Sequence, residues 1–313
     1  MAKVPHLVQY QGSKRILAPE IIRYFPDDIQ TLYEPFSGTC AVTILAAQEK
    51  LCDSFVVNDI NAPLVGLMQE CIEEPSRLSE AYKEIWSGQY EPGENNINYF
   101  YKIRDQFNAG QKDPARMLFV LARVVKGAVR YNADGIMNQS CDKRRYGTKP
   151  EIVAKNAMEI SRLLKGKTKY FALDYREIFK MATPKDLIYM DPPYQGTSNQ
   201  EDPRDNRYIA GVQFDEFVEA LHTLNERNIR YIVSYDGQTG DKIIGKSLPD
   251  DLNLKHLLIN AGVSAQATLM GKKEITYESL YLSPGLFRKP DAYHQMTLFD
   301  ILPKERYSSR DYQ

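Results

Sequence analysis

Short apolar runs alternate with amphipathic stretches along most of the 313-residue chain. Runs of apolar and β-branched residues predict strands at 31–34, 54–58, 169–173, 187–190, 230–234 and 276–282. Apolar positions at helical spacing predict helices at 14–24, 41–50 and 214–225, and a mostly helical segment between residues 62 and 170. Strands that alternate with helices are typical of an α/β protein with a doubly wound, mainly parallel sheet.

The strand at 187–190 runs directly into Asp191-Pro192-Pro193-Tyr194. Two prolines end strand pairing because proline has no N–H to donate, but this does not explain the carboxylate or the aromatic ring. Ligands of open α/β sheets bind beyond the carboxyl ends of the strands. A carboxylate, a stiff backbone and an aromatic face at that place would suit a flat ligand with hydrogen-bond donors, such as a nucleobase.

Other predicted strands also end on acidic residues. The stretch EPFSGTC (34–40) follows one strand, and Gly38 would let the backbone approach a ligand closely. Asp59 ends the next strand, 21 residues after Gly38, where an acid is suited to bind ribose hydroxyls. Together they predict a cofactor that contains adenosine. Asp174 ends a third strand, where it could bind amino groups of that cofactor, cap a helix over 175–181, or do both.

The charge of the chain is distributed unevenly, although the net charge is only −1. Residues 102–170 hold 16 Lys and Arg against 6 Asp and Glu, and the rest of the chain holds 24 against 35. This asymmetry indicates either a segment that faces a polyanion or well-solvated helix faces. The four scattered cysteines are typical of reduced cytosolic thiols, and no metal-ligand cluster is visible. We expect neither a signal peptide nor a membrane span.

Taken in order, these stretches resemble the Dam-like (alpha-group) DNA-adenine methyltransferases of the DPPY type. The blocks are YQGSK (10–14), EPFSGTC (34–40), VVNDIN (56–61), a basic insert, and DPPY (191–194). The resemblance covers roughly residues 9–283, and the order of the blocks is more specific than any one of them. It implies the S-adenosylmethionine-dependent methyltransferase fold with an inserted, mostly helical DNA-recognition subdomain. The expected division is a catalytic domain (1–61 and 170–284), an insert (62–169) and a C-terminal tail (285–313).

The resemblance also assigns residues to roles. It implies that S-adenosylmethionine is surrounded by Tyr10, Lys14, Glu34, Phe36, Gly38, Asp59 and Asp174. It implies that Asp191, Pro192 and Tyr194 hold the target adenine. Judged on its own, Lys14 would instead be a solvated residue at a helix start. The chain departs from the family at Cys40, where the last glycine of EPFxGxG usually stands, and a small thiol fits there if φ stays negative.

A second departure is ARVVKG (122–127), where the family often has an Asn-rich segment. The candidate DNA-binding residues of the insert are Arg130, Asn132, Lys143, Arg144, Arg145 and Lys149. Arginines among them could read guanine edges or contact phosphates alone. Because the target amine is inaccessible inside a duplex, the adenine must be flipped out.

The expected chemistry needs no metal. The Asp191 carboxylate and the Pro192 carbonyl would each accept an N–H of the adenine amine, which localises its lone pair, while Tyr194 stacks on the base. The function predicted is site-specific methylation of adenine in duplex DNA, by a cytoplasmic, nucleoid-associated enzyme. The alternatives are the same chemistry on cytosine, RNA or protein glutamine, and a catalytically dead DNA-binding regulator. A cognate restriction endonuclease is a candidate partner.

Two segments outside these blocks carry predictions of their own. Residues 195–212 form a long polar stretch that is either a lid over the site or a surface loop. The tail contains QMTLF (295–299), which resembles the peptide by which bacterial proteins bind the DNA sliding clamp. Gln295, Leu298 and Phe299 would make that contact. Alternatively, the apolar pair docks on the protein's own core.

Overall fold

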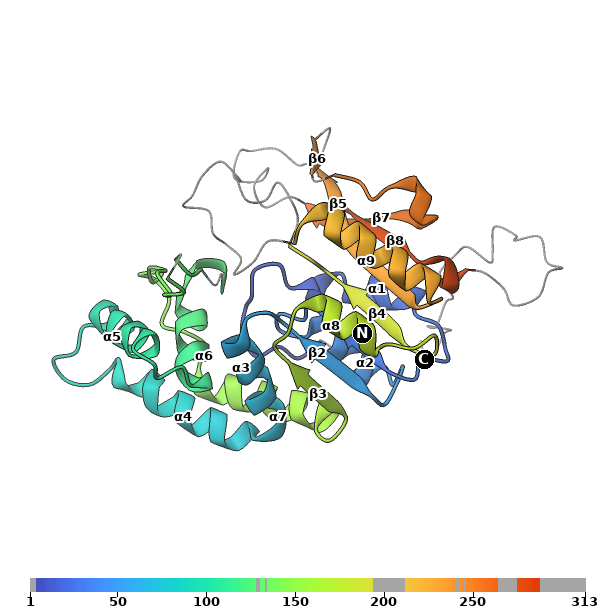
Figure 1. Ribbon diagram of the computed structural model, residues 1–313. Helices are drawn as coiled ribbons and strands as arrows, with labels where there is room; N and C mark the ends of the chain where they lie inside the picture. Colours follow the sequence, from blue (N-terminus) through green and yellow to red (C-terminus); the bar gives the residue numbers. More distant parts are fainter. Residues whose placement is uncertain are drawn as a thin grey trace, which may run out of the picture.

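The computed structural model describes residues 4–127, 130–132, 134–193, 212–239, 242–244, 246–263 and 275–287. Their strands form one sheet in the order β3-β2-β1-β4-β5-β8-β7, with β6 paired to β5 (Figure 1). The strands are β1 (Leu32–Glu34), β2 (Phe55–Asn58), β3 (Thr168–Phe171), β4 (Leu187–Met190), β5 (Arg230–Thr239), β6 (Lys242–Ile244), β7 (Lys255–Val263) and β8 (Ile275–Leu282). Strands β3 to β5 of this order are parallel, and β8 is antiparallel to both β5 and β7. The predicted mainly parallel α/β sheet is therefore confirmed.

The register of the central strands brings their carboxyl ends to one edge. Leu32 of β1 lies opposite Phe55 of β2 and Leu187 of β4. The strands are short and in step, so the residues that follow them, including Asp59 and Asp191, leave the sheet at the same side. This is the edge at which α/β proteins bind ligands.

Helices cover both faces of the sheet. They are α1 (Ala18–Ile21), α2 (Ala41–Gln48), α3 (Ala62–Glu73), α4 (Pro75–Gly88), α5 (Asn96–Asn108), α6 (Pro114–Arg123), α7 (Pro150–Leu164), α8 (Tyr175–Met181) and α9 (Phe214–Glu226). The 3₁₀ helices are η1 (Lys14–Ile16), η2 (Ile22–Tyr24), η3 (Val125–Gly127), η4 (Asp250–Leu252) and η5 (Pro284–Leu286). The single helix predicted over 14–24 is instead η1, α1 and η2, because Pro19 has no N–H to continue a helix from η1.

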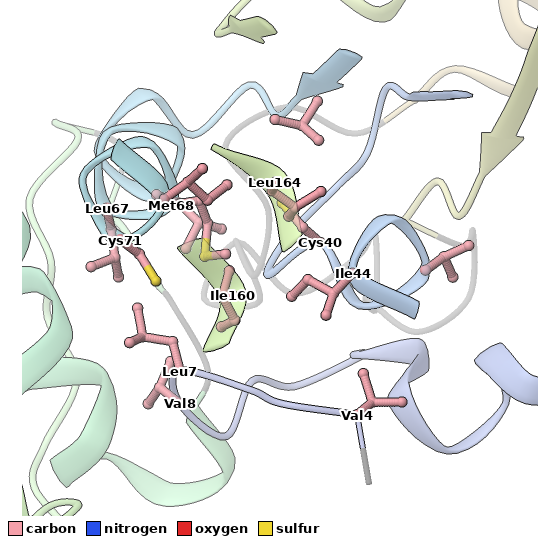
Figure 2. Packing of buried hydrophobic residues seen from close by; sticks show 14 of the residues in the cluster. Val4, Leu7, Val8, Cys40, Ile44, Leu67, Met68, Cys71, Ile160 and Leu164 are labelled. Atoms are coloured by element: carbon pink, nitrogen blue, oxygen red, sulfur yellow. The ribbon is translucent and has the colours of Figure 1, made fainter. Parts of the chain in front are cut away.

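Alternation along the strands divides the core into two clusters. Leu187 and Tyr189 of β4 join the cluster on the side of α2 and α3, whereas Ile188 and Met190 join the cluster of α8 and α9. Figure 2 shows part of the first cluster, to which α2 contributes Ile44, α3 contributes Leu67 and α7 contributes Ile160. Full burial of one such side chain contributes about 1.5–3 kcal/mol.

Helices α3 to α7 form the insert, which the sequence pattern predicted to be mostly helical. Helix α4 packs against α6 and α7, and α5 packs against α6, on the side of the molecule away from β7 and β8 (Figure 1). Arg123 is fully buried among these helices, where its guanidinium donates hydrogen bonds to the Gln89 side chain and the Asn96 carbonyl. None of the described helices has the length and apolar character that spanning a bilayer requires.

Candidate active site

A cavity of about 340 Å³ opens at the carboxyl ends of the parallel strands. Every described residue that the sequence assigned to the cofactor or the target base lines it, namely Tyr10, Lys14, Glu34, Phe36, Gly38, Asp59, Asp174, Asp191 and Pro192. These residues come from five separate segments of the chain, so the fold brings together what the sequence separates. Tyr194, the 195–211 stretch and the tail residues Gln295, Leu298 and Phe299 lie outside the described residues.

The glycine turn after β1 is held by Asp59. Gly38 has φ +50°, and its N–H donates to Asp59 Oδ2 at 3.0 Å. A side chain at Gly38 would meet the Tyr10 ring, because a Cβ built there lies 3.3 Å from it. Asp59 Oδ1 accepts from the Asn61 N–H at 2.9 Å. Burial raises the pKa of Asp59, and the two backbone donors partly offset that effect. Each oxygen keeps a lone pair that could accept a ribose hydroxyl.

Cys40 departs from the expectation that its φ is negative. Its φ is +57°, in the left-handed region where glycine is usual, and it stands as the N-cap of α2. A non-glycine residue in this conformation costs about 1–2 kcal/mol. The turn requires it, because the Cys40 N–H closes back onto the Ser37 carbonyl at 2.7 Å. Burial also raises the pKa of the thiol well above its ordinary value.

Glu34 ends β1 as a fully buried carboxyl. Its Oε2 accepts from the Thr43 N–H at 3.1 Å and from the Thr43 hydroxyl at 2.6 Å. The pKa of Glu34 is raised to about 8, chiefly by burial and also by the charge of Asp191, and the Thr43 hydrogen bonds offset part of that rise. Glu34 is therefore mostly protonated at neutral pH in the ligand-free protein.

Lys14 is buried inside the cavity wall, so the interpretation of it as a solvated residue is wrong, although it does begin a helix, η1. Its Nζ lies 3.1 Å from Asp191 Oδ1 and 3.0 Å from Glu278 Oε2. Burial lowers the pKa of Lys14, but the charges of Asp191 and Glu278 outweigh this and raise it above its ordinary value. The sequence reasoning did not single out Glu278. The sequence gives one indication of its role: Glu278 is an acidic residue within a strand, β8, whose second half is buried.

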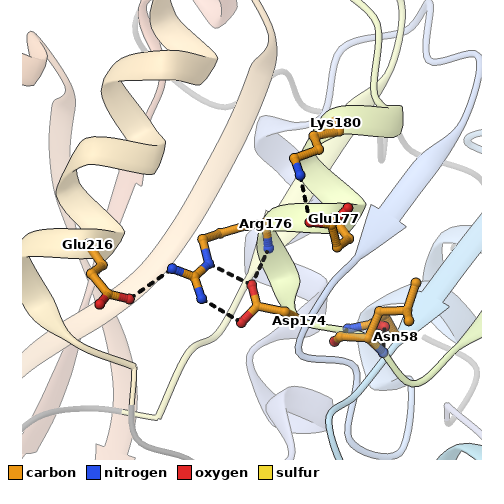
Figure 3. Close-up of polar contacts among 7 residues, drawn as sticks. Asn58, Asp174, Arg176, Glu177, Lys180 and Glu216 are labelled. Carbon is orange, nitrogen blue, oxygen red and sulfur yellow. Dashed lines mark hydrogen bonds and ion pairs between the residues drawn. The ribbon is translucent and has the colours of Figure 1, made fainter.

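Asp174 forms the N-cap of α8, which confirms one of the two roles predicted for it. Its Oδ1 accepts from the Arg176 N–H at 2.9 Å, and the Arg176 guanidinium holds both carboxylate oxygens (Figure 3). These contacts keep the pKa of Asp174 below its ordinary value. The same guanidinium reaches Glu216 of α9 at 3.0 Å, so Arg176 joins α8 and α9 beside the cavity. Sequence reasoning found neither Arg176 nor Glu216.

The family model of the D12 class N6 adenine-specific DNA methyltransferases matches residues 10–262. The chain belongs to this family. The adenine-specific DNA methyltransferase that the sequence predicted is thus confirmed by the family match.

Named relatives of the methyltransferase agree with the family match. The Type II methyltransferase M1.LlaDCHI of Lactococcus lactis subsp. cremoris is 27% identical over 59% of this chain, and the match spans 64% of its own length. The Retron Ec67 DNA adenine methylase of Escherichia coli is 24% identical over 83% of this chain and 86% of its own length. The DNA adenine methylase of Haemophilus influenzae is 27% identical over 60% of this chain and 63% of its own length.

The predicted DNA-binding residues of the methyltransferase fall into two groups. The first group has structural contacts: Asn132 Oδ1 accepts the N–H of Ile136, and the Arg145 guanidinium donates to Gln9 Oε1 at 3.0 Å. The second group is exposed and consists of Arg130, Lys143, Arg144 and Lys149. Lys149 also precedes α7 as its N-cap residue. The second group holds the candidates that are classed as exposed, although the Arg145 side chain of the first group is also 41% exposed.

The insert of the methyltransferase also reaches the cavity itself. Tyr131 lines the cavity, and its hydroxyl donates to Asn61 Oδ1 at 3.2 Å. Asn61 is the residue whose N–H holds Asp59. Tyr131 and Asn61 were not predicted, although Tyr131 stands next to two candidate DNA-binding residues.

Proposed function

We propose that the chain transfers the methyl group of S-adenosylmethionine to the exocyclic amine of an adenine flipped out of duplex DNA. The position of Asp191 and Pro192 carries this proposal, since they share one cavity with Glu34, Gly38 and Asp59. A base-binding edge and a nucleotide-type glycine turn then open onto the same space. Methyl transfer requires the base and the cofactor to lie close together, because the amine nitrogen attacks the methyl group in line with the bond to sulfur.

The donor set of the cavity suits a cationic cofactor that contains adenosine. When bound, S-adenosylmethionine supplies a methyl group on a positively charged sulfur. Glu34, Asp59 and Asp174 provide carboxyl groups for cationic and donor groups. The Phe36 ring lies 5.3 Å from that of Tyr175 and offers an apolar wall for a purine.

The chain's own residues would act on the adenine rather than on the methyl group. Asp191 Oδ1 contacts Lys14. Because the two oxygens of a carboxylate offer about four acceptor sites, Asp191 can also accept an N–H of the amine. The Pro192 carbonyl would accept the second N–H. With both protons bound, the nitrogen lone pair is less delocalised into the ring and points toward the methyl group. A preorganised acceptor pair of this kind lowers the barrier mainly by orientation and electrostatics.

The exposed cations of the insert would bind the DNA backbone and help to hold the base out of the stack. Extrusion of a base costs a few kcal/mol, and phosphate contacts can offset that cost. An enzyme that acts on genomic DNA would work in the cytoplasm beside the nucleoid. The type II methyltransferase among the relatives supports a cognate restriction endonuclease as a partner.

The test uses tritiated S-adenosylmethionine with DNA and, separately, with RNA. We expect label in N6-methyladenine of DNA, loss of label in Asp191→Ala, and retained DNA binding by that variant. The matched control is Asp53→Ala. Asp53 is an exposed carboxylate that precedes β2 and pairs with Lys167, which precedes β3, so both lie at the end of the strands opposite the cavity. Label in RNA alone would favour an RNA substrate. Sequence-specific DNA binding with no label would favour the regulator.

A further inference from the structure

Lys14 joins two carboxylates that come from distant parts of the chain. Asp191 follows β4 and Glu278 lies in β8, with β5 between these two strands in the sheet. The Lys14 Nζ reaches Asp191 Oδ1 at 3.1 Å and Glu278 at 3.2 Å (Oε1) and 3.0 Å (Oε2). The three side chains are only 9%, 17% and 20% exposed, respectively. Lys14 is therefore the bridge through which Glu278 can act on Asp191.

The strand geometry around Glu278 places it for this contact. Glu278 pairs with Gly237 of β5, directly after a register shift that begins at Ser234. A Cβ at Gly237 would lie 2.7 Å from the Tyr277 carbonyl, so the two backbones approach more closely than a side chain allows. Irregularities of this kind redirect side chains and are common beside active sites.

The charge balance explains why the second carboxylate matters. A buried ammonium needs a negative charge nearby to offset the cost of its desolvation. If that charge came from a single carboxylate, the ammonium would neutralise it almost completely. An ammonium shared between two carboxylates neutralises each of them only in part. The cluster of Lys14, Asp191 and Glu278 carries a net charge of −1, so Asp191 keeps much of its strength as a hydrogen-bond acceptor.

We propose that Glu278 is a positioning residue that holds Lys14 so that Asp191 stays oriented and negative enough to bind the adenine amine. This rests on the proposed role of Asp191 as the acceptor of that amine. Glu278 does not line the cavity, so it would reach the substrate only through Lys14 and Asp191. Its effect should therefore be on turnover rather than on binding.

The experiment measures kcat and KM for DNA, and the Kd of S-adenosylmethionine, in Glu278→Gln. This change keeps the size of the side chain and removes its charge. We expect kcat to fall on the order of tenfold, because Lys14 then loses the charge of Glu278 and its ammonium neutralises Asp191 more fully, while KM and Kd change less than about twofold. The matched control is Glu177→Gln, since Glu177 is an exposed carboxylate whose partner is Lys180. A wild-type kcat in Glu278→Gln would overturn the proposal.

Two further variants separate positioning from a merely structural role. Glu278→Asp keeps the charge but is one methylene shorter, so its kcat should lie between wild type and Glu278→Gln. If Glu278→Gln does not fold, a folded Glu278→Asp with wild-type kcat overturns the proposal, and one with reduced kcat supports it. In a Lys14→Gln background, Glu278→Gln should cause no further loss, because the bridge is already gone. An equal loss in both backgrounds would contradict the proposal.

Failure of this inference is distinguishable from failure of the proposed function. If wild type labels adenine and Glu278→Gln does so equally fast, only the role of Glu278 is wrong. If wild type and Glu177→Gln both leave adenine unlabelled, the proposed function itself is wrong.

Discussion

Glu34 shows how burial sets the charge of a single active-site residue. Its pKa of about 8, against an ordinary value of 4.5, means that the ligand-free protein holds a proton there at neutral pH. A positively charged cofactor favours the carboxylate, so binding should release that proton. We predict that cofactor affinity rises as pH increases from about 6 to 8 and then levels off, because above the pKa no proton remains to be removed.

Calorimetry in two buffers of different ionisation enthalpy measures this release, which should approach one proton per cofactor at pH 7. In Glu34→Gln it should disappear, whereas release that persists in this variant would assign the proton to another group. The stability of the fold should depend on pH in the opposite direction to cofactor affinity. The unfolded chain ionises Glu34 from about pH 4.5 and the folded protein only near pH 8, so folded stability contributed by this group is lost across that window.

At the residue scale, the sequence indicates which polar residues belong to the site, but it does not show which of their side chains are buried. Glu34, Asp59 and Asp191 could be selected because each follows an apolar run. The burial of Lys14 could not be predicted, since its neighbours 11–13 look like an exposed turn and its partner Glu278 is 264 residues away. Backbone strain was equally hidden, because the positive φ of Cys40 follows from how the turn closes rather than from its residue type.

At the scale of elements, the segment between α6 and α7 presents cations to solvent, and one of them, Arg144, also lies 3.8 Å from Asp142 Oδ1 through its Nε. Lys143 and Arg144 are exposed, and the Arg144 side chain is 93% exposed. We predict that Lys143→Gln or Arg144→Gln weakens DNA binding similarly for all sequences and reduces the slope of log K against log salt by about 0.9. Fluorescence anisotropy at several salt concentrations measures both quantities.

The matched control is Lys167→Gln, because Lys167 precedes β3 at the edge of the sheet opposite the cavity. Its salt slope should equal that of wild type. If Arg144→Gln changes affinity for one DNA sequence only and leaves the slope intact, Arg144 reads a base edge rather than a phosphate.

Most elements could be predicted because their burial is regular. Strand β4 is apolar throughout and buried on both faces, and its predicted bounds are those observed. Strand β7 was not predicted, because its pattern is that of an edge strand. Ile259 is buried there while Leu258 is 53% exposed, and a register shift between Asn260 and Gly262 interrupts the alternation.

At the scale of the whole molecule, a chain of hydrogen bonds connects the cavity to the insert. It runs from the Gly38 N–H to Asp59, from Asp59 to the Asn61 N–H, and from the Asn61 side chain to the Tyr131 hydroxyl. The backbone of Gly127 also lies against Gln9, where a Cβ would come within 1.8 Å of the carbonyl oxygen. These contacts join segments far apart in sequence, so spacing alone could not reveal them. They give the insert, which is proposed to bind DNA, a direct connection to the turn that is proposed to hold the cofactor.

We predict that this connection couples the two ligands. A cofactor that orders Gly38 and Asp59 should also order Asn61 and Tyr131, and so favour DNA binding. With S-adenosylhomocysteine as the unreactive probe, we expect wild type to bind DNA more tightly by on the order of fivefold. Tyr131→Phe keeps the ring and removes the hydroxyl, so it should bring this factor close to one. Anisotropy of labelled DNA with and without the probe measures it.

The control for this prediction is Tyr90→Phe, because Tyr90 is an exposed tyrosine of the same insert that stacks on Tyr146. Its coupling should match wild type. Thermodynamic reciprocity supplies an independent check, since DNA must change the affinity for S-adenosylhomocysteine by the same factor. A Tyr131→Phe protein that keeps the full factor in both directions would show that the insert and the cavity communicate by another route, or that the hydrogen bond to Asn61 only stabilises the fold.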